Sequence, residues 1–211
     1  MKFRLTVIQL LNHLACALPL IIIVVGTLTH QLTANPIREA TLRSGRTSLT
    51  LLLLSFTCRP LRNFLDMDSF LLIRKDLGLY GAFYALLHFL NFIGRDYQFA
   101  WTDIFPLIFN QTFLQVGLVA LGILIVLFIS STSFFQRRFP GFWREYRFLS
   151  YAAFGIALFH YYLAIKGDKT NALIYLLIFL ILVILRLKPF RNFQFHLPFM
   201  QKLNTLLKQL L

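Results

Sequence analysis

Six long apolar runs constrain the fold of this chain more than any other feature. They cover residues 5–28, 47–61, 77–94, 112–131, 148–165 and 170–187. Most of them reach the ~17–25 residues that an α-helix needs to cross ~30 Å of hydrocarbon. Because lipid offers the backbone no hydrogen-bond partner, only helices and closed barrels can span it. The pattern predicts an all-α, polytopic integral membrane bundle of six transmembrane helices.

Composition and charge agree with this prediction. Hydrophobic residues make up 58% of the chain and charged residues only 14%, whereas a soluble helical domain needs a polar face on each helix. All eight acidic residues fall between the apolar runs, which argues against a proton- or cation-coupled transporter. The net charge of +13 does not indicate a nucleic-acid partner, since the basic residues form no single stripe. Two cysteines, Cys16 and Cys58, form no disulfide framework.

Lysine and arginine are distributed unevenly between the two ends of the predicted helices. With six helices both termini lie on one side, and that side carries fifteen Lys and Arg residues against six on the other. The positive-inside rule therefore places both termini in the cytoplasm. The second run is the weakest, because Arg59, Pro60 and Arg62 lie at its end. It spans the bilayer only if these arginines extend to the interface.

The chain divides into a transmembrane domain, residues 1–189, and a basic cytoplasmic tail, residues 190–211. The tail carries leucines at helical spacing, namely Leu203, Leu206, Leu207 and Leu210. This spacing favours a short helix on the membrane surface. The alternative is a frayed basic terminus.

Two histidines lie inside the predicted helices at matched depth. His88 is six residues before Gly94, and His160 is six residues before Lys166. The third and fifth helices run parallel from the cytoplasm outward, so each histidine lies ~9 Å below the outer boundary. Two neutral imidazoles at one depth can bind a six-coordinate haem iron from opposite faces. The pair is a candidate metal and cofactor site, and the alternative for each is a hydrogen bond to a neighbouring helix.

The remaining residues give little support for a further metal site or for catalysis. His13, in the cytoplasmic half of the first run, is expected to hydrogen-bond a neighbouring helix, with ligation as the alternative. His30 and His196 are expected in a loop and in the tail. The sequence has no Cys/His cluster with zinc spacing, no glycine-rich phosphate loop and no recognisable nucleophile–base arrangement. Hydrolytic and phosphoryl-transfer chemistry are not supported, and no internal repeat is apparent.

Short motifs follow one another along the chain in an order that resembles a known family. They are Asn35-Pro36, Ser44-Gly45-Arg46-Thr47, Pro60-Leu61-Arg62, Arg74, Leu77-Gly78-Leu79, His88, Thr132-Ser133, Trp143, Tyr151, His160-Tyr161, Tyr175 and Arg186. Their order and spacing are similar to those of the haem-binding membrane subunits of bacterial periplasmic methionine sulfoxide reductase systems. These subunits belong to the ferric reductase-like transmembrane group. The resemblance covers most of the chain.

The resemblance implies a function as well as a fold. It implies haem b bound by His88 and His160, with FMN and a quinone as further cofactors. It also implies a location in the bacterial inner membrane, where electrons come from quinol or a flavin reductase on the cytoplasmic side. They would pass to a periplasmic molybdopterin-containing methionine sulfoxide reductase. Such a chain is an electron-transfer subunit rather than a complete enzyme.

One position departs from the family pattern. The family has a histidine four residues after the tryptophan, whereas here Trp143 is followed at that place by Arg147. Arginine stays protonated and offers no lone pair to iron. The residues from Arg147 to His160 correspond to ~20 Å of helix, a long gap for one haem. The ligand that a second, inner haem would take from this position is therefore missing, and Arg147 is either a positive-inside anchor or a partner of a haem propionate or of a quinone or flavin head group.

Two other functions are compatible with the sequence. A transmembrane ferric or metal reductase would use the same haem and pass electrons to a metal ion outside. A non-redox membrane scaffold would keep the fold and lose the relay. Arg147 is the best argument for the scaffold, and the retained His88 and His160 are the main obstacle to it. The colour of the purified protein distinguishes a haem-containing redox protein from the scaffold, because a haem protein is red and the scaffold is colourless.

Overall fold

The structure is a computed structural model that describes residues 6–29, 31, 33–65, 67–139, 141 and 148–186. Its elements are α1 (Val7–Leu28), α2 (Pro36–Leu65), α3 (Ser69–Asn91), the π-helical turn η1 (Phe92–Asp96), α4 (Trp101–Asn110), α5 (Thr112–Ser130), α6 (Ser133–Arg138), α8 (Leu149–Ala164) and α9 (Thr170–Ile184). Every regular element in these residues is helical, which confirms the all-α prediction.

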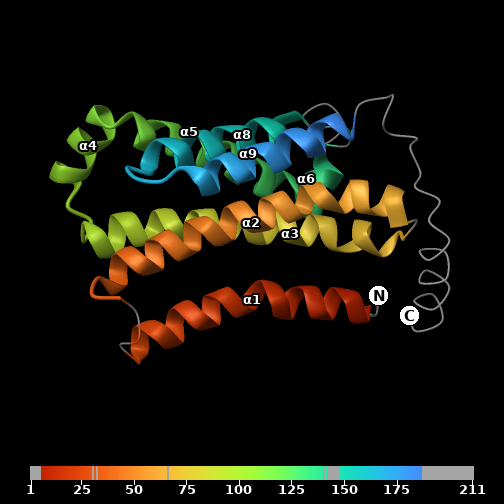
Figure 1. Ribbon diagram of the computed structural model, residues 1–211, viewed down its shortest axis with the longest axis horizontal. Helices are drawn as coiled ribbons and strands as arrows, with labels where there is room; N and C mark the ends of the chain where they lie inside the picture. Colours follow the sequence, from red (N-terminus) through yellow and green to blue (C-terminus); the bar gives the residue numbers. More distant parts are fainter. Residues whose placement is uncertain are drawn as a thin grey trace.

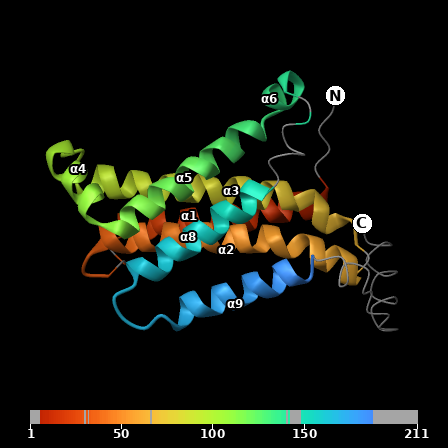
Figure 2. The ribbon, with the colours of Figure 1, turned by 90° about the horizontal axis from the view of Figure 1, so that it is seen from above.

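The long helices lie side by side in three layers. Figure 1 shows α1 as one outer layer, α2 and α3 as the middle layer, and α5, α8 and α9 as the other outer layer. The most extensive packing is between α2 and α3, followed by that between α5 and α8. α4 lies at one end of the bundle and α6 lies toward the other (Figure 2). The closely packed α2–α3 pair therefore forms the middle layer, and the α5–α8 pair forms most of the outer layer that covers one side of it.

The apolar lengths of the helices support a membrane protein. Three segments are long and apolar enough to cross a bilayer, namely Val7–Leu28, Ser69–Asp96 and Thr112–Ser130. α8 and α9 are apolar but have only 16 and 15 residues, and α2 has 30 residues of lower hydrophobicity. On α1, the side chains of Leu11, Leu14, Leu18 and Val25 are exposed, as expected of a surface that contacts lipid. The prediction of six crossings continues to rest on the sequence.

Two helices begin well before the apolar runs that predicted them. α2 starts at Pro36 because proline suits the first helical position and Asn35 caps the helix, its Oδ1 accepting from the Arg38 N–H at 3.0 Å. α3 likewise starts at Ser69. Glu39 therefore lies on a helix rather than in the loop predicted between the first two runs. It pairs with Arg43 one turn later, at 2.7 Å.

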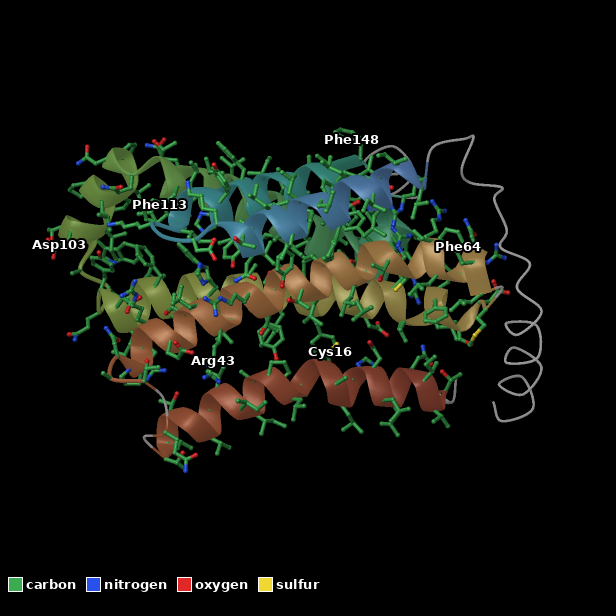
Figure 3. The ribbon with its side chains drawn as sticks, viewed as in Figure 1. Cys16, Arg43, Phe64, Asp103, Phe113 and Phe148 are labelled. Carbon is green, nitrogen blue, oxygen red and sulfur yellow. The ribbon has the colours of Figure 1, made fainter. Side chains whose placement is uncertain are left out.

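The hydrophobic core lies between the layers in two clusters. One cluster joins α2 to α5, α8 and α9, and includes Leu52, Phe56, Leu124, Phe154 and Leu158. The other joins α1 to the middle layer, and consists of Cys16, Leu51, Cys58, Leu77 and Tyr84. Figure 3 shows Cys16 between α1 and the middle layer. Both cysteines are free and buried, in agreement with the absence of a disulfide framework.

Tyr84 of α3 inserts its hydroxyl into the backbone of α1. The hydroxyl accepts from the Leu20 N–H at 2.9 Å and donates to the Cys16 carbonyl at 2.8 Å. These two groups would otherwise bond to each other in the helix. The insertion lies beside Pro19, which has no N–H to donate. Side-chain insertion and proline both bend helices, and Figure 1 shows α1 bending near its middle.

His13 also connects α1 to α3. Its Nδ1 lies 3.1 Å from the Tyr80 hydroxyl, and its Nε2 lies 3.9 Å from Asp76. This contact confirms the predicted hydrogen bond between helices.

Candidate functional site

His88 of α3 and His160 of α8 face each other inside the bundle. Their ring centroids lie 6.2 Å apart, and the ring planes meet at 75°. The sequence predicted equal depth for these residues on two parallel helices. The structure adds that the helices turn both rings toward the same space.

The outward nitrogen of each ring is bonded to a backbone carbonyl of a neighbouring helix. His88 Nδ1 lies 2.8 Å from the Thr41 carbonyl oxygen of α2, and His160 Nδ1 lies 2.6 Å from the Phe113 carbonyl oxygen of α5. A carbonyl can only accept, so each Nδ1 carries the proton in these contacts. Each Nε2 is then left with a lone pair, which is the form of histidine that binds a metal.

A glycine beside each histidine makes room for its ring. A Cβ atom added at Gly45 would lie 2.9 Å from His88 Nδ1, and one added at Gly117 would lie 2.7 Å from His160 Nδ1. Each glycine is one turn after the residue whose carbonyl accepts the hydrogen bond. Because glycine has no side chain, α2 and α5 can approach the rings closely enough to form these bonds.

The two helix pairs repeat this arrangement at the same sequence distance. Both the carbonyl residue of α2 and that of α5 precede their histidine by 47 residues. The α2–α3 pair and the α5–α8 pair therefore hold their histidines in the same way, which the sequence analysis did not predict. The shared positions are few and mostly involve the backbone, so they leave little sequence similarity. A glycine at the same distance before each histidine is the signal that could have found them.

The two rings line a cavity of about 390 Å³, within the ~300–1,000 Å³ usual for ligand and cofactor sites. Its walls are mainly apolar and include Leu49, Phe89 and Leu121, while Arg38 and Arg46 line its exposed rim. No carboxylate is among the described residues that line it. The cavity combines an apolar interior with positive charge at its edge.

The donor set fits a haem iron with two axial histidines. The two rings lie with centroids 6.2 Å apart across an apolar cavity, and His88 and His160 would be the residues that hold a haem iron there. Within the described ranges, no group of three or more His, Cys, Asp or Glu could hold a metal ion. The pair is thus suited to a metal that brings its own equatorial ligands, as a porphyrin does.

A second cavity, of about 370 Å³, adjoins the first at Leu124, which lines both. The described residues around this second cavity include no histidine or cysteine, so they offer an iron no axial nitrogen or sulfur. Trp143 and Arg147, the residues of the departure from the family pattern, lie outside the described residues. His30, His196 and residues 190–211 also lie outside them.

The fold and the first cavity define a helical membrane protein with a paired-histidine site. Comparison with known families agrees with this class. The family described as ferric reductase like transmembrane component matches residues 44–158, which is more than half of the chain. The matched segment runs from α2 into α8 and includes His88.

Individual relatives narrow the assignment within this family. The protein-methionine-sulfoxide reductase heme-binding subunit MsrQ of Rhodospirillum rubrum is 35% identical over 176 residues, which are 83% of this chain and 85% of the relative. MsrQ of Deinococcus radiodurans is 34% identical over 176 residues, covering 81% of this chain and 85% of the relative. MsrQ of Caulobacter vibrioides is 30% identical over 186 residues, covering 88% and 89%. The chain therefore belongs to the ferric reductase-like transmembrane family and, within it, to the MsrQ group.

Proposed function

We propose that the chain is the haem-binding membrane subunit of a protein-methionine-sulfoxide reductase system and passes electrons across the bacterial inner membrane. The observation that carries the proposal is the facing pair of His88 and His160, each with Nδ1 bonded and Nε2 available. Family membership supports it, because the relatives are named as heme-binding subunits of that system.

In this proposal, different residues around the first cavity bind the iron, orient the histidine rings, contact the propionates and exclude water. Haem b, when bound, would supply reversible one-electron chemistry. His88 and His160 would hold the iron through Nε2, and the carbonyls bonded to Nδ1 would orient the rings and raise their basicity. Arg38 and Arg46 at the rim would offer positive charge to the propionates. The apolar walls would exclude water from the iron.

One haem is proposed, at the end of the bundle where α4 lies. The cytoplasmic donor is quinol or a flavin reductase, with FMN as a further cofactor. The acceptor is a periplasmic molybdopterin-containing reductase. At the α4 end, the described chain offers short connections and the ten-residue α4, too little for a substrate domain. The reductase is therefore a separate chain that docks at this end.

The proposed orientation follows the charge distribution. Phe64 and Asp103 mark opposite ends of the bundle in Figure 3, and the Phe64 end belongs to the side that carries fifteen of the Lys and Arg residues. This end is proposed to face the cytoplasm. Residues 1–189 then form one membrane unit with six crossings, and both termini are cytoplasmic.

The experiment that tests the function follows the haem spectrum of the purified full-length protein during turnover. A flavin reductase with NADH should produce the spectrum of a reduced b-type haem under anaerobic conditions. The periplasmic reductase and methionine sulfoxide, added together, should return it to the oxidised form. Absence of haem despite ample supply would favour the scaffold. Reoxidation by ferric citrate but not by the reductase would favour the metal reductase.

A further inference from the structure

The short helix α4 joins two membrane spans at one end of the bundle. The candidate spans Ser69–Asp96 and Thr112–Ser130 flank it in the sequence, and α4 itself has only ten residues, too few to cross a bilayer. Figure 1 shows it at the end of the bundle, where α3 ends and α5 begins. A helix in this position lies at the surface of the membrane.

One face of α4 covers the first cavity. Ile104 is completely buried, with 0% of its surface exposed, and Ile108, one turn later, lines the cavity. The far end of the helix is held to α5, because the Gln115 side-chain amide donates to the Phe109 carbonyl at 2.8 Å. α4 therefore closes the cavity at the end of the bundle.

The next face of the helix is aromatic and exposed. At ~100° per residue, side chains four positions apart follow one another along a stripe. Trp101, Phe105 and Phe109 form this aromatic face, and they are 47%, 55% and 75% exposed. The rings of Trp101 and Phe105 lie 5.8 Å apart, and Phe99 adds a further exposed ring 6.2 Å from Trp101. Such a patch marks a surface of contact with an apolar partner.

The third face of α4 is mainly polar. Thr102, Asp103 and Asn110 lie on it, and all three are exposed. Figure 3 shows Asp103 at the outermost end of the bundle. With the polar face directed away from the bundle and Ile104 directed into it, the aromatic face points sideways. Helices that lie in a membrane surface have this arrangement, with Trp and Phe in the headgroup layer and polar groups in water.

The turn before α4 fixes the direction in which the helix leaves α3. Gln98 and Phe99 have φ angles of 48° and 60°, a conformation that strains residues other than glycine. The Phe99 N–H donates to the Ile93 carbonyl at 2.8 Å, and a Cβ added at Gly94 would lie 3.1 Å from the Phe99 ring. Packing of the turn against η1 thus maintains a strained conformation that turns α4 across the end of the bundle.

We propose that the aromatic face of α4 binds the phospholipid surface at this end of the bundle, and that this contact holds α4 over the first cavity. Lipid is the occupant because the face continues the surface of the two spans that flank α4. The lipid contact does not depend on haem. Only its consequence, the exclusion of water from an iron in the cavity, rests on the proposed function.

The lipid contact is tested with the full-length protein in phosphatidylcholine nanodiscs that contain either ordinary or brominated lipid. The variants Phe105→Cys and Phe109→Cys carry the fluorophore NBD on the aromatic face. Asp103→Cys is the matched control, because this residue is exposed on the polar face of the same helix. The wild type gives the background labelling of Cys16 and Cys58, which are buried.

Brominated lipid should quench the labels at positions 105 and 109 at least about twofold more than the label at 103, and aqueous iodide should show the opposite order. Equal quenching by brominated lipid at all three positions would overturn the proposal. So would iodide quenching at 105 and 109 that disappears when the periplasmic reductase is added, since the face would then bind a protein.

The hold on the cavity is tested by hydrogen–deuterium exchange of residues 101–110 in the same nanodiscs. A double variant, Phe105→Asn with Phe109→Asn, should exchange at least about tenfold faster than wild type, because two side chains lose their apolar contact. The control Thr102→Asn places the same residue on the polar face and should exchange as wild type does. Unchanged exchange in the double variant would show that lipid does not hold α4 in place. This readout needs no haem, so failure of the proposed function leaves it intact.

Discussion

His88 and His160 face each other with ring centroids 6.2 Å apart, and a backbone carbonyl holds the outward nitrogen of each ring. The two carbonyls come from α2 and α5, which are different helices from those that carry the histidines. Four helices thus fix two side chains before any ligand arrives. Such preorganisation lets a site hold a metal without paying to order its ligands.

Gly117 should be essential to the position of His160. In Gly117→Ala the added Cβ would lie 2.7 Å from His160 Nδ1, so the ring must move and lose the Phe113 carbonyl. Loss of such an outer contact typically weakens metal binding ~10–100-fold. We expect Gly117→Ala to lower haem content and to weaken the low-spin, six-coordinate signal in electron paramagnetic resonance. Gly45→Ala should do the same through His88.

The control for these variants is Gly122→Ala on the same helix as Gly117. A Cβ at Gly122 would meet no atom within 4 Å, so its haem content and spectrum should match those of the wild type. A Gly117→Ala protein with an unchanged spectrum would show that the glycine does not position the histidine.

Tyr84→Phe should loosen the attachment of α1. Removal of the hydroxyl takes away the partner of the Leu20 N–H and of the Cys16 carbonyl. Each buried group left without a partner costs about 1–3 kcal/mol, so the thermal midpoint in detergent should fall. Tyr162→Phe is the matched control, because this tyrosine is partly exposed. An equal thermal midpoint for the two variants would mean that the Leu20 N–H bonds directly to the Cys16 carbonyl within α1 when the hydroxyl is absent.

The start of α9 should depend on pH through Asp168. Hydrogen bonds from the Thr170 hydroxyl and backbone N–H hold the pKa of this carboxyl below its ordinary value. A lowered pKa in the folded state means that the charged form stabilises the fold above about pH 4 and that this stabilisation is lost as the pH falls further. The difference in thermal midpoint between wild type and Asp168→Ala should be constant from pH 7 to about pH 5. It should shrink below about pH 4, and a difference that grows there would contradict the assignment.

Membrane orientation can be read from single-cysteine labelling of intact cells. Gly167→Cys, between α8 and α9, should react with an impermeant maleimide added outside the inner membrane. Ser133→Cys, at the start of α6, should react only after the membrane is opened. Both positions are exposed, while the native Cys16 and Cys58 are buried. The opposite pattern of labelling would invert the orientation, and labelling of both positions would contradict the proposed number of crossings.

The sequence could predict the helical class and the histidine pair because the first depends on the length of the apolar runs and the second on the depth of each residue along its helix. Apolar length identifies a helix in lipid, and a fixed rise per residue converts sequence position into depth. The helix starts at Pro36 and Ser69 were missed, since caps and packing rather than apolar length determine them. The roles of Gly45 and Gly117 were also missed, because a close approach between helices leaves no periodic pattern.

The second cavity shows another limit of sequence reasoning. Arg59 and Arg74 were read as charges that mark the cytoplasmic side, which accounts for their number and sign. Their gathering around one cavity depends on how α2 and α3 pair. The absence of a partner for the Arg74 Nε becomes visible only when its neighbours are placed.

The central claim is tested most directly by haem stoichiometry. Full-length wild type, His88→Ala, His160→Ala and His13→Ala are expressed with ample haem, purified, and measured by dithionite-reduced minus oxidised spectra. The account predicts one b-type haem per chain in wild type and in His13→Ala, and loss of the six-coordinate signal in each of the other two. A six-coordinate signal that survives both His88→Ala and His160→Ala would contradict it.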